Sequence, residues 1–247
     1  MLKTVFLACA DDAIGRFEGS MLLQQVLMEF FVFWLDTAED ISGSRYNPRE
    51  VCTWQGVECN AVGEVMRFEW AFKMEHEAGT VGLQFLPWSM TDLNMSFNAL
   101  SGTIQLADLP EKMGNLNLSK NRLSGSLRLD DLPVPMKRVF LGQHTFSGEI
   151  SLERLPKVLR VLNLSMNTHQ GTICLTSLPP VLETMYFNEN MFDADPIDGH
   201  RKVVGQDQYP ALGEVRETAK LLPRGESPWW RDEGRHLLIL CCFQSAG

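Results

Sequence analysis

Cysteine and histidine are the side chains of this 247-residue chain best suited to metal binding or nucleophilic chemistry. The six cysteines form no Cys-x-x-Cys pair, and the five histidines lack the spacing of metal ligands. The chain also lacks a Gly-x-Ser-x-Gly nucleophile motif, a phosphate-binding glycine loop and a kinase signature. The sequence therefore predicts a protein that is not an enzyme and that binds no metal or cofactor.

The composition favours a folded protein and argues against nucleic acid as a general partner. Hydrophobic residues make up 45% of the chain, which is enough for a packed core. The formal net charge of -9 argues against a general nucleic-acid binder, because neutralising phosphates requires clustered Lys and Arg. No stretch reaches the roughly 18 to 20 apolar residues that a transmembrane helix needs.

Several residue types recur every 23 positions through the middle of the chain. The proline column consists of Pro87, Pro110, Pro133, Pro156 and Pro179, and a leucine precedes each proline. The Asn column consists of Asn98, Asn121, His144, Asn167 and Asn190. The Gly column consists of Gly79, Gly102, Gly125, Gly148 and Gly171. Columns that keep their register in this way predict stacked repeats.

The repeats that start at Met90, Met113 and Leu159 read MTDLNMSFNALSGTI, MGNLNLSKNRLSGSL and LRVLNLSMNTHQGTI. They resemble the L-x-x-L-x-L-x-x-N-x-L signature of leucine-rich repeats, and the resemblance extends over residues 65–192. It implies an α/β-type solenoid, a horseshoe of 23-residue repeats with a parallel β-sheet on its concave face. Alternate leucines of each strand point inward, and the Asn side chain bonds backbone groups of the neighbouring turn. A weak first unit from Arg67 aligns Ala71 with Asn94.

The stretch CTWQGVEC at residues 52–59 directly precedes the repeats. It resembles the C-x-W-x-G-V-x-C cap of extracellular leucine-rich repeats of the plant type. The resemblance implies a disulfide between Cys52 and Cys59, with Trp54 packed on the first repeat. Such a disulfide would place the chain in an oxidising compartment. The alternative is a pair of reduced cysteines in a loop.

Residues 21–35, MLLQQVLMEFFVFWL, carry apolar side chains at helical spacing. The stripe comprises Leu23, Val26, Leu27, Phe30, Phe31 and Trp34. We predict a helix that caps the first repeat, with a hydrophobic targeting or membrane-surface segment as the alternative. The first twelve residues resemble a short signal peptide. The predicted organisation is an N-terminal segment and cap at 1–64, repeats at 65–192 and an irregular tail at 193–247.

The tail is rich in charge, Gly and Pro and shows no repeat. We expect Trp229 and Trp230 to dock on the last repeat. The seven apolar residues from Leu237 to Phe243 are too few to span a bilayer.

Outward-pointing strand residues should line up across the repeats on the concave face. Aromatic and Arg side chains on such a surface are the types that dominate protein-binding hot spots. The candidate partner-binding residues are Asp92, Asn94, Phe97, Asn117, Lys120, Arg138, Phe140, Gln143, Asn163, Met166 and Tyr186. The alternative is a mildly apolar surface without a partner.

Charge and glycosylation signals bear on this face. Residues 112–160 hold nine Lys or Arg and four Asp or Glu, so we expect an acidic or mixed-charge partner at the middle repeats. Asn94, Asn117 and Asn163 each begin an Asn-x-Ser sequon and are candidate glycosylation sites in a secreted protein. Glycans there would crowd the binding face, so these two uses compete. His144 is interpreted as an Asn substitute that still hydrogen-bonds locally, with a pH switch as the alternative.

These features favour non-catalytic recognition of another protein at a cell surface or outside the cell. The resemblance includes ectodomains of receptor-like proteins, protozoan surface antigens and repeat-type inhibitors of secreted enzymes. The repeats depart from the plant Gly-x-Ile-Pro pattern, because Pro follows the Ile or Leu by six residues, and this leans toward the protozoan type. Inhibition of a secreted enzyme is one alternative. A cytoplasmic scaffold, or a degenerate copy of the family, is the other.

Overall fold

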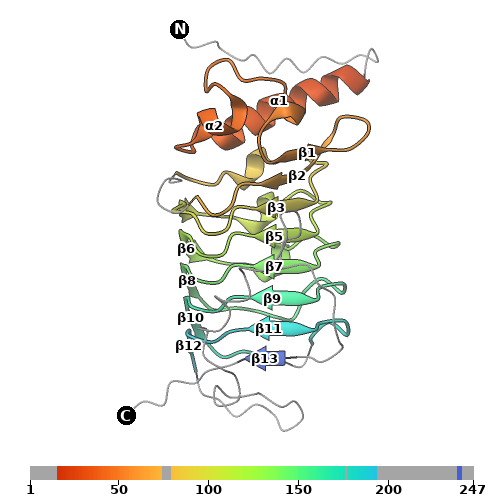
Figure 1. Cartoon of the computed structure of the whole chain (residues 1–247). Coiled ribbons are helices and arrows are strands. Elements are labelled where there is room, and N and C mark those ends of the chain that lie inside the picture. Colours follow the sequence, from red (N-terminus) through yellow and green to blue (C-terminus); the bar gives the residue numbers. More distant parts are fainter. Residues whose placement is uncertain (1–15, 74–78, 176, 194–237, 241–247) are drawn as a thin grey trace, which may run out of the picture.

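The computed structural model describes residues 16–73, 79–175, 177–193 and 238–240, with backbone only for 16–23 and 238–240. Strands stack one above another beneath a helical cap (Figure 1). The larger sheet has eight strands in the order β1-β2-β3-β5-β7-β9-β11-β13, all parallel except for the β1–β2 pair. Their bounds are β1 (Val57–Cys59), β2 (Val65–Glu69), β3 (Asp92–Asn94), β5 (Asn115–Asn117), β7 (Arg138–Phe140), β9 (Val161–Asn163), β11 (Thr184–Tyr186) and β13 (Leu238–Leu240).

Each three-residue strand of the repeats buries its middle side chain and leaves both neighbours partly exposed, because successive side chains of a strand point to opposite faces. The buried residues are Leu93, Leu116, Val139, Leu162 and Met185. Two positions further on, Met95, Leu118, Leu141, Leu164 and Phe187 are buried as well. The predicted solenoid, with its parallel sheet built from repeats, is confirmed.

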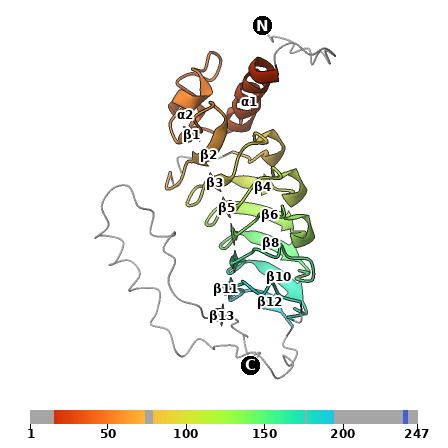
Figure 2. The same ribbon diagram turned by 90° about the vertical axis from the view of Figure 1, so that its right-hand side faces the viewer.

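A second parallel sheet along the side of the stack was not predicted (Figure 2). Its order is β12-β10-β8-β6-β4, with β4 (Ser101–Thr103), β6 (Arg122–Ser126), β8 (Thr145–Gly148), β10 (Thr168–Gly171) and β12 (Met191–Phe192). These segments have no apolar alternation, so no period-two signal marks them as strands. They also contain the Gly column, where Gly102, Gly125, Gly148 and Gly171 have φ of 83–95°, a conformation that a side chain rarely adopts.

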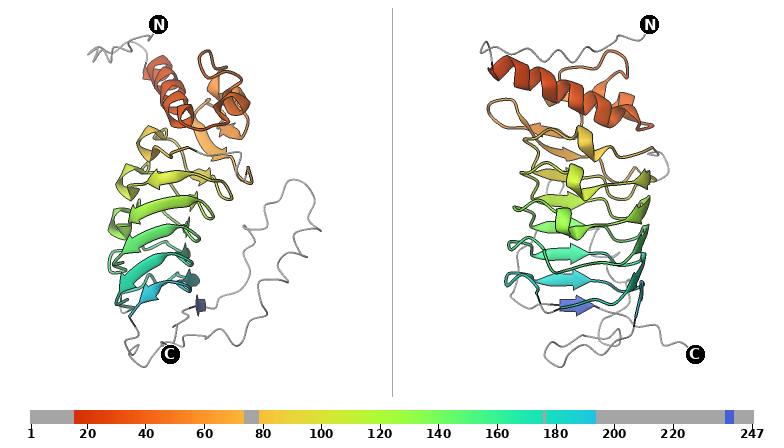
Figure 3. Two further views of the ribbon diagram at one scale, coloured as in Figure 1. Left: turned by 90° about the vertical axis from the view of Figure 1, so that its left-hand side faces the viewer. Right: turned by 180° about the vertical axis from the view of Figure 1, so that it is seen from behind.

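The return segments lie behind the larger sheet (Figure 3). They contain the 3-10 helices η3 (Leu83–Phe85), η4 (Leu106–Asp108) and η5 (Leu129–Asp131). Each proline of the proline column then accepts, at its carbonyl, a bond from the residue three positions later, as in Met90 N–H to Pro87 O at 3.0 Å. Proline thus starts the turn that leads into the next strand, where its missing N–H leaves no bond unmade.

The Asn column forms a ladder of buried hydrogen bonds. Asn121 shows the pattern: its Nδ2 donates to Met95 O at 2.9 Å and to Leu118 O at 2.7 Å. Its Oδ1 accepts from Leu100 N–H at 3.0 Å. Asn98, Asn167 and Asn190 make corresponding bonds. One side chain therefore bonds three buried backbone groups, and a carbonyl such as Met95 O accepts from the Asn side chains of two successive repeats.

The cap consists of α1 (Arg16–Phe33), α2 (Ala38–Ser42), η1 (Val51–Thr53) and β1. The predicted helix is present, but its buried face differs from the predicted stripe. Gln24, Met28, Phe31, Val32 and Leu35 are buried. Of the predicted stripe, Phe30 is 42% and Trp34 is 59% exposed, and only Phe31 is buried among the side chains that are described.

The polar Gln24 explains this rotation. Its Nε2 donates to Gly63 O at 2.6 Å, and its amide oxygen Oε1 accepts from Val65 N–H at 2.9 Å. These bonds tie the helix to the start of β2. An apolar stripe counts Gln as an outward residue, so the predicted stripe is rotated relative to the buried face, although Phe30 still stacks on Phe85 with centroids 5.5 Å apart.

The predicted disulfide between Cys52 and Cys59 is confirmed, with the Cα atoms 5.7 Å apart. Trp54 is buried in the common core, and its indole N–H donates to Arg49 O at 2.7 Å. Gly56 has a φ of 82°, and a Cβ there would lie 2.2 Å from Glu69 O. The cap loop therefore approaches β2 too closely for any other residue at position 56.

Replacing both bridged cysteines by serine should lower the free energy of unfolding by about 2–3 kcal/mol, because the short loop is no longer closed in the unfolded chain. Urea titration of the double variant checks this value. Reducing the wild-type protein should cause a similar loss, whereas Cys174→Ser, at an exposed cysteine outside the bridge, should change stability little. Equal stability of the oxidised protein and the double variant would contradict the prediction.

The register of the first repeat corrects the sequence alignment. Arg67 pairs with Asp92 and Glu69 with Asn94, so Glu69, and not Ala71, continues the central column. The spacing from Phe72 to Gly79 is two residues longer than that from Phe97 to Gly102. The regular glycine spacing hides this difference from the sequence.

The last strand comes from the segment assigned to an irregular tail. Leu238–Leu240 pairs in parallel with β11, with Ile239 opposite Met185. Trp229, Trp230, Cys241 and Cys242 lie outside the described residues.

Candidate protein-binding surface

The concave face is formed by the outward side chains of β3, β5, β7, β9 and β11. The predicted residues Asn94, Asn117, Phe140, Asn163 and Tyr186 lie in one row across it, because these strands pair in register. Asp92 and Arg138 belong to the neighbouring row. The structure thus brings these seven predicted residues together, all of them partly exposed.

The other four predicted residues form a rim beside the strands. Phe97, Lys120, Gln143 and Met166 directly precede the Asn column, and their φ values lie between 56° and 62°. Phe72 and Glu189 adopt the same left-handed conformation. Side chains of six turns therefore leave the backbone in the same way, along one edge of the concave face.

The sequon asparagines have a local structural role. Asn94 Oδ1 accepts from Ser96 N–H at 3.2 Å and from the Ser96 hydroxyl at 2.8 Å. Asn163 bonds Ser165 in the same way, at 3.0 and 2.8 Å. A side chain that caps its own turn two residues later favours Asn followed by Ser at this spacing. The turn thus supplies a reason for the Asn-x-Ser pattern that is independent of glycosylation.

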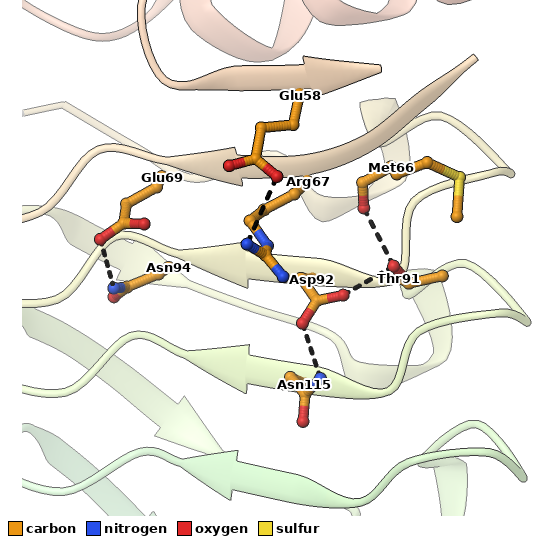
Figure 4. A network of polar contacts seen from close by, with 8 residues as sticks. All are labelled: Glu58, Met66, Arg67, Glu69, Thr91, Asp92, Asn94 and Asn115. Atoms are coloured by element: carbon orange, nitrogen blue, oxygen red, sulfur yellow. Dashed lines mark hydrogen bonds and ion pairs between the residues drawn. The ribbon is translucent and has the colours of Figure 1, made fainter. Parts of the chain in front are cut away.

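A polar network occupies the end of this face nearest the cap (Figure 4). Arg67 pairs with Glu58 of β1 at 3.3 Å. The Asp92 carboxylate accepts from the Thr91 hydroxyl and from Asn115 Nδ2, each at 2.6 Å. Sequence reasoning missed Glu58 and Arg67, because β1 and β2 precede the clear repeats.

The basic residues of the middle repeats are spread over several surfaces, and the expected acidic or mixed-charge partner stays a prediction. Lys120 and Arg138 lie on the rim and the concave face. Arg122 belongs to β6 of the second sheet. Near η5, Arg128 pairs with Asp131 at 3.5 Å, and Arg154 pairs with Asp130 at 4.0 Å. Only part of the local positive charge therefore lies on the concave side.

The aromatic rim is the set Phe72, Phe97 and Lys120. The two rings stack with centroids 4.4 Å apart, and Lys120 Nζ lies 4.2 Å from the centre of the Phe97 ring. Phe72 is 54% exposed. Sequence reasoning found Phe97 and Lys120 but missed Phe72. The alignment from Arg67 set Phe72 opposite Met95, whereas the observed pairing of Glu69 with Asn94 makes Phe72 the counterpart of Phe97.

Two histidines of the second sheet are buried: His144 directly precedes β8, and His169 belongs to β10. Burial lowers the pKa of His144 to about 4, against a smaller upward effect of backbone hydrogen bonds. Its Nδ1 accepts from Leu123 N–H at 3.3 Å, so it partly replaces an Asn, as interpreted. Burial also lowers the pKa of His169, which lies between Phe146 and Phe192. Among the described residues, the Nε2 atoms of both rings are buried without a hydrogen-bond partner.

Within the part of the chain that the structure describes, no three His, Cys, Asp or Glu residues are grouped so as to hold a metal ion. In the same part, no helix has the length and apolar character needed to span a membrane.

No family model matches the chain, and no curated protein matches it either. Solved structures do. A chain of the BIR3–SERK2 complex from Arabidopsis thaliana is similar with a TM-score of 0.56 and 24% identity, over 69% of this chain and 95% of that one. The BIR2 ectodomain from Arabidopsis thaliana gives 0.54 and 20%, over 71% and 97%.

The SOBIR1 ectodomain from Arabidopsis thaliana, described as a leucine-rich repeat ectodomain, gives a TM-score of 0.53 and 19% identity, over 71% of this chain and 96% of that one. The chain has the leucine-rich repeat fold. The similarity extends over nearly the whole of these three chains, so the leucine-rich repeat unit here is of comparable extent.

Proposed function

We propose that this leucine-rich repeat protein recognises another protein through its concave face and performs no catalysis. The observation that carries the proposal is the in-register row of partly exposed side chains across five parallel strands. Phe140 lies between Asn117 and Asn163 in that row, and Tyr186 follows on β11. Aromatic side chains surrounded by amides suit a protein interface, where apolar anchors need nearby polar groups.

We further propose that the protein acts outside the cell or at its surface. The Cys52–Cys59 disulfide supports this, because such bridges persist in oxidising compartments. The similar solved structures include ectodomains, which supports the same location. Similarity to protozoan surface proteins remains a prediction from the repeat pattern.

Glycan mapping separates the two competing uses of the concave face. Sugar on Asn94, Asn117 and Asn163 would cover the central row that the proposal assigns to a partner. Mass spectrometry of the native protein should therefore find these asparagines largely bare and Cys52 joined to Cys59. Full occupancy at all three would contradict recognition through this row.

Charge reversal on the concave face should weaken binding of a protein partner. We expect Arg138→Glu and Lys120→Glu each to reduce affinity by about tenfold or less, and together to reduce its dependence on salt, because exposed charges chiefly assist association. Phe140→Ala should cost more, as truncated aromatic anchors do.

Affinity purification from the native host, quantified for the wild type and each variant, provides the measurement. The matched control is Arg122→Glu, which makes the same change in charge on the second sheet. A partner that is lost equally with Arg122→Glu, or retained by all the concave-face variants, would contradict the assignment.

A further inference from the structure

We propose that the aromatic rim, with the hollow beside it, binds a short peptide segment of the partner in which an apolar residue lies next to an acidic one. This rests on the proposed recognition function and names a subsite for it. The apolar residue packs against Phe72 and Phe97, and the carboxylate meets Lys120.

The rim is held in place before any ligand arrives. The backbone N–H groups of Phe72, Phe97 and Lys120 donate to Ser96 O, Ser119 O and Gly142 O at 3.0, 2.9 and 2.9 Å. The ring stack and the Lys120 ammonium above Phe97 fix the side chains further. Groups that are already ordered lose little conformational entropy on binding, so even a small contact can contribute affinity.

A hollow of about 470 Å³ adjoins Phe72 between the cap and the first repeats. Its lining includes Gln55, Trp70, Phe72 and Lys73. Lys73 Nζ lies 3.8 Å from the centre of the Trp70 ring. The indole N–H of Trp70 donates to the Thr37 hydroxyl of the cap at 3.0 Å, and its backbone N–H donates to Asn94 O at 2.8 Å, so one wall of the hollow is anchored to both units. The hollow gives an apolar side chain a place beside the exposed ring of Phe72.

Charge sets the direction of the segment. Glu58 and Glu69 line the hollow together with Lys73, so the hollow has no excess of positive charge to attract a carboxylate. Lys120 stands at the opposite end of the rim, is exposed, and keeps N–H groups for a carboxylate while it covers Phe97. Neighbouring strands are about 4.8 Å apart, so the acidic residue should lie one or two positions from the apolar one in an extended segment.

The test uses a phage-displayed library of random dodecapeptides, selected on the intact oxidised chain. Enriched peptides should contain a Phe, Leu, Ile or Trp within two positions of Asp or Glu. Synthetic versions should lose at least tenfold in affinity for Phe72→Ala combined with Phe97→Ala. Their affinity for the Lys120→Glu variant should be about fivefold lower than for the wild type. Replacing the acidic residue of the peptide by Lys should restore binding to that variant.

Two controls keep the test decisive. Val134→Ala and Lys157→Glu change exposed residues outside the rim and should leave affinity unchanged. Each variant should also unfold at the wild-type temperature. Enriched peptides without the apolar–acidic pattern, or peptides that bind the rim variants normally, would overturn the proposal, as would a library that yields no rim-dependent peptide. Binding that is lost in Phe140→Ala but unaffected by the rim variants would overturn the rim and leave the concave-face function standing.

Discussion

Replacing Asn121 by alanine is expected to lower the free energy of unfolding by about 2–4 kcal/mol, because it leaves the buried Leu118 O and Leu100 N–H without their bonds and takes from Met95 O one of its two. The side chain is 8% exposed and bonds Met95 O, Leu118 O and Leu100 N–H. Water cannot readily replace these bonds, since Met95, Leu118 and Leu100 are themselves buried.

Chemical denaturation of the oxidised protein gives the measurement. Asn47→Ala is the matched control, since Asn47 is exposed in the cap, and we expect it to change stability by less than about 0.5 kcal/mol. Asn121→His should fall between the two, because an imidazole nitrogen can accept the Leu100 bond as His144 accepts that of Leu123. A loss below about 1 kcal/mol for Asn121→Ala would show that the ladder is not a main source of stability.

Acidification should destabilise the protein through His144. The pKa of this side chain is about 4 in the folded protein against 6.5 for the free group, so the unfolded chain binds the proton more readily. The free energy of unfolding should therefore fall as the pH drops from about 6.5 to about 4, and level off below. The full effect is about 3 kcal/mol, from about 1.4 kcal/mol for each pH unit of difference.

His144→Asn isolates this effect, because it restores the residue that holds the column at Asn121 and Asn167. Carboxylates titrate in both proteins, so the difference between the two stability curves reports on the histidine. The variant should gain stability over the wild type as the pH falls from 6.5. His169→Phe should flatten the remaining slope in the same direction, because burial also lowers the pKa of His169. Parallel curves for wild type and His144→Asn between pH 7 and 4 would contradict the assignment.

The repeats carried most of the predictable information. A side chain that recurs at a fixed spacing must meet the same environment in each turn, so Leu116 and Asn121 could be placed from the sequence. The cap disulfide followed from the resemblance of CTWQGVEC to a known motif. The candidate residues of the concave face could be placed on it because outward positions alternate with buried ones.

The remaining features depend on contacts that no local pattern encodes. Gln24 is buried because two backbone groups of a distant segment face it, which rotates the buried face of α1 away from the predicted stripe. The first repeat contains two additional residues, so the structure places Glu69 in the central row, where the sequence alignment had placed Ala71. Phe72 joined the aromatic rim for the same reason. His169 occupies the position of Phe146 in the preceding repeat, and only the structure shows that this polar ring is fully buried.

The central claim, that the concave face binds a protein, is tested most directly by site-specific photo-cross-linking in the native host. A benzophenone amino acid would replace Phe140 in one variant and Arg122, on the second sheet, in the other. The account predicts that the probe at position 140 captures a defined protein, and that Arg138→Glu removes this product. The probe at position 122 should not capture it. Equal capture at both positions, or capture at 140 that is unaffected by Arg138→Glu, would contradict the account.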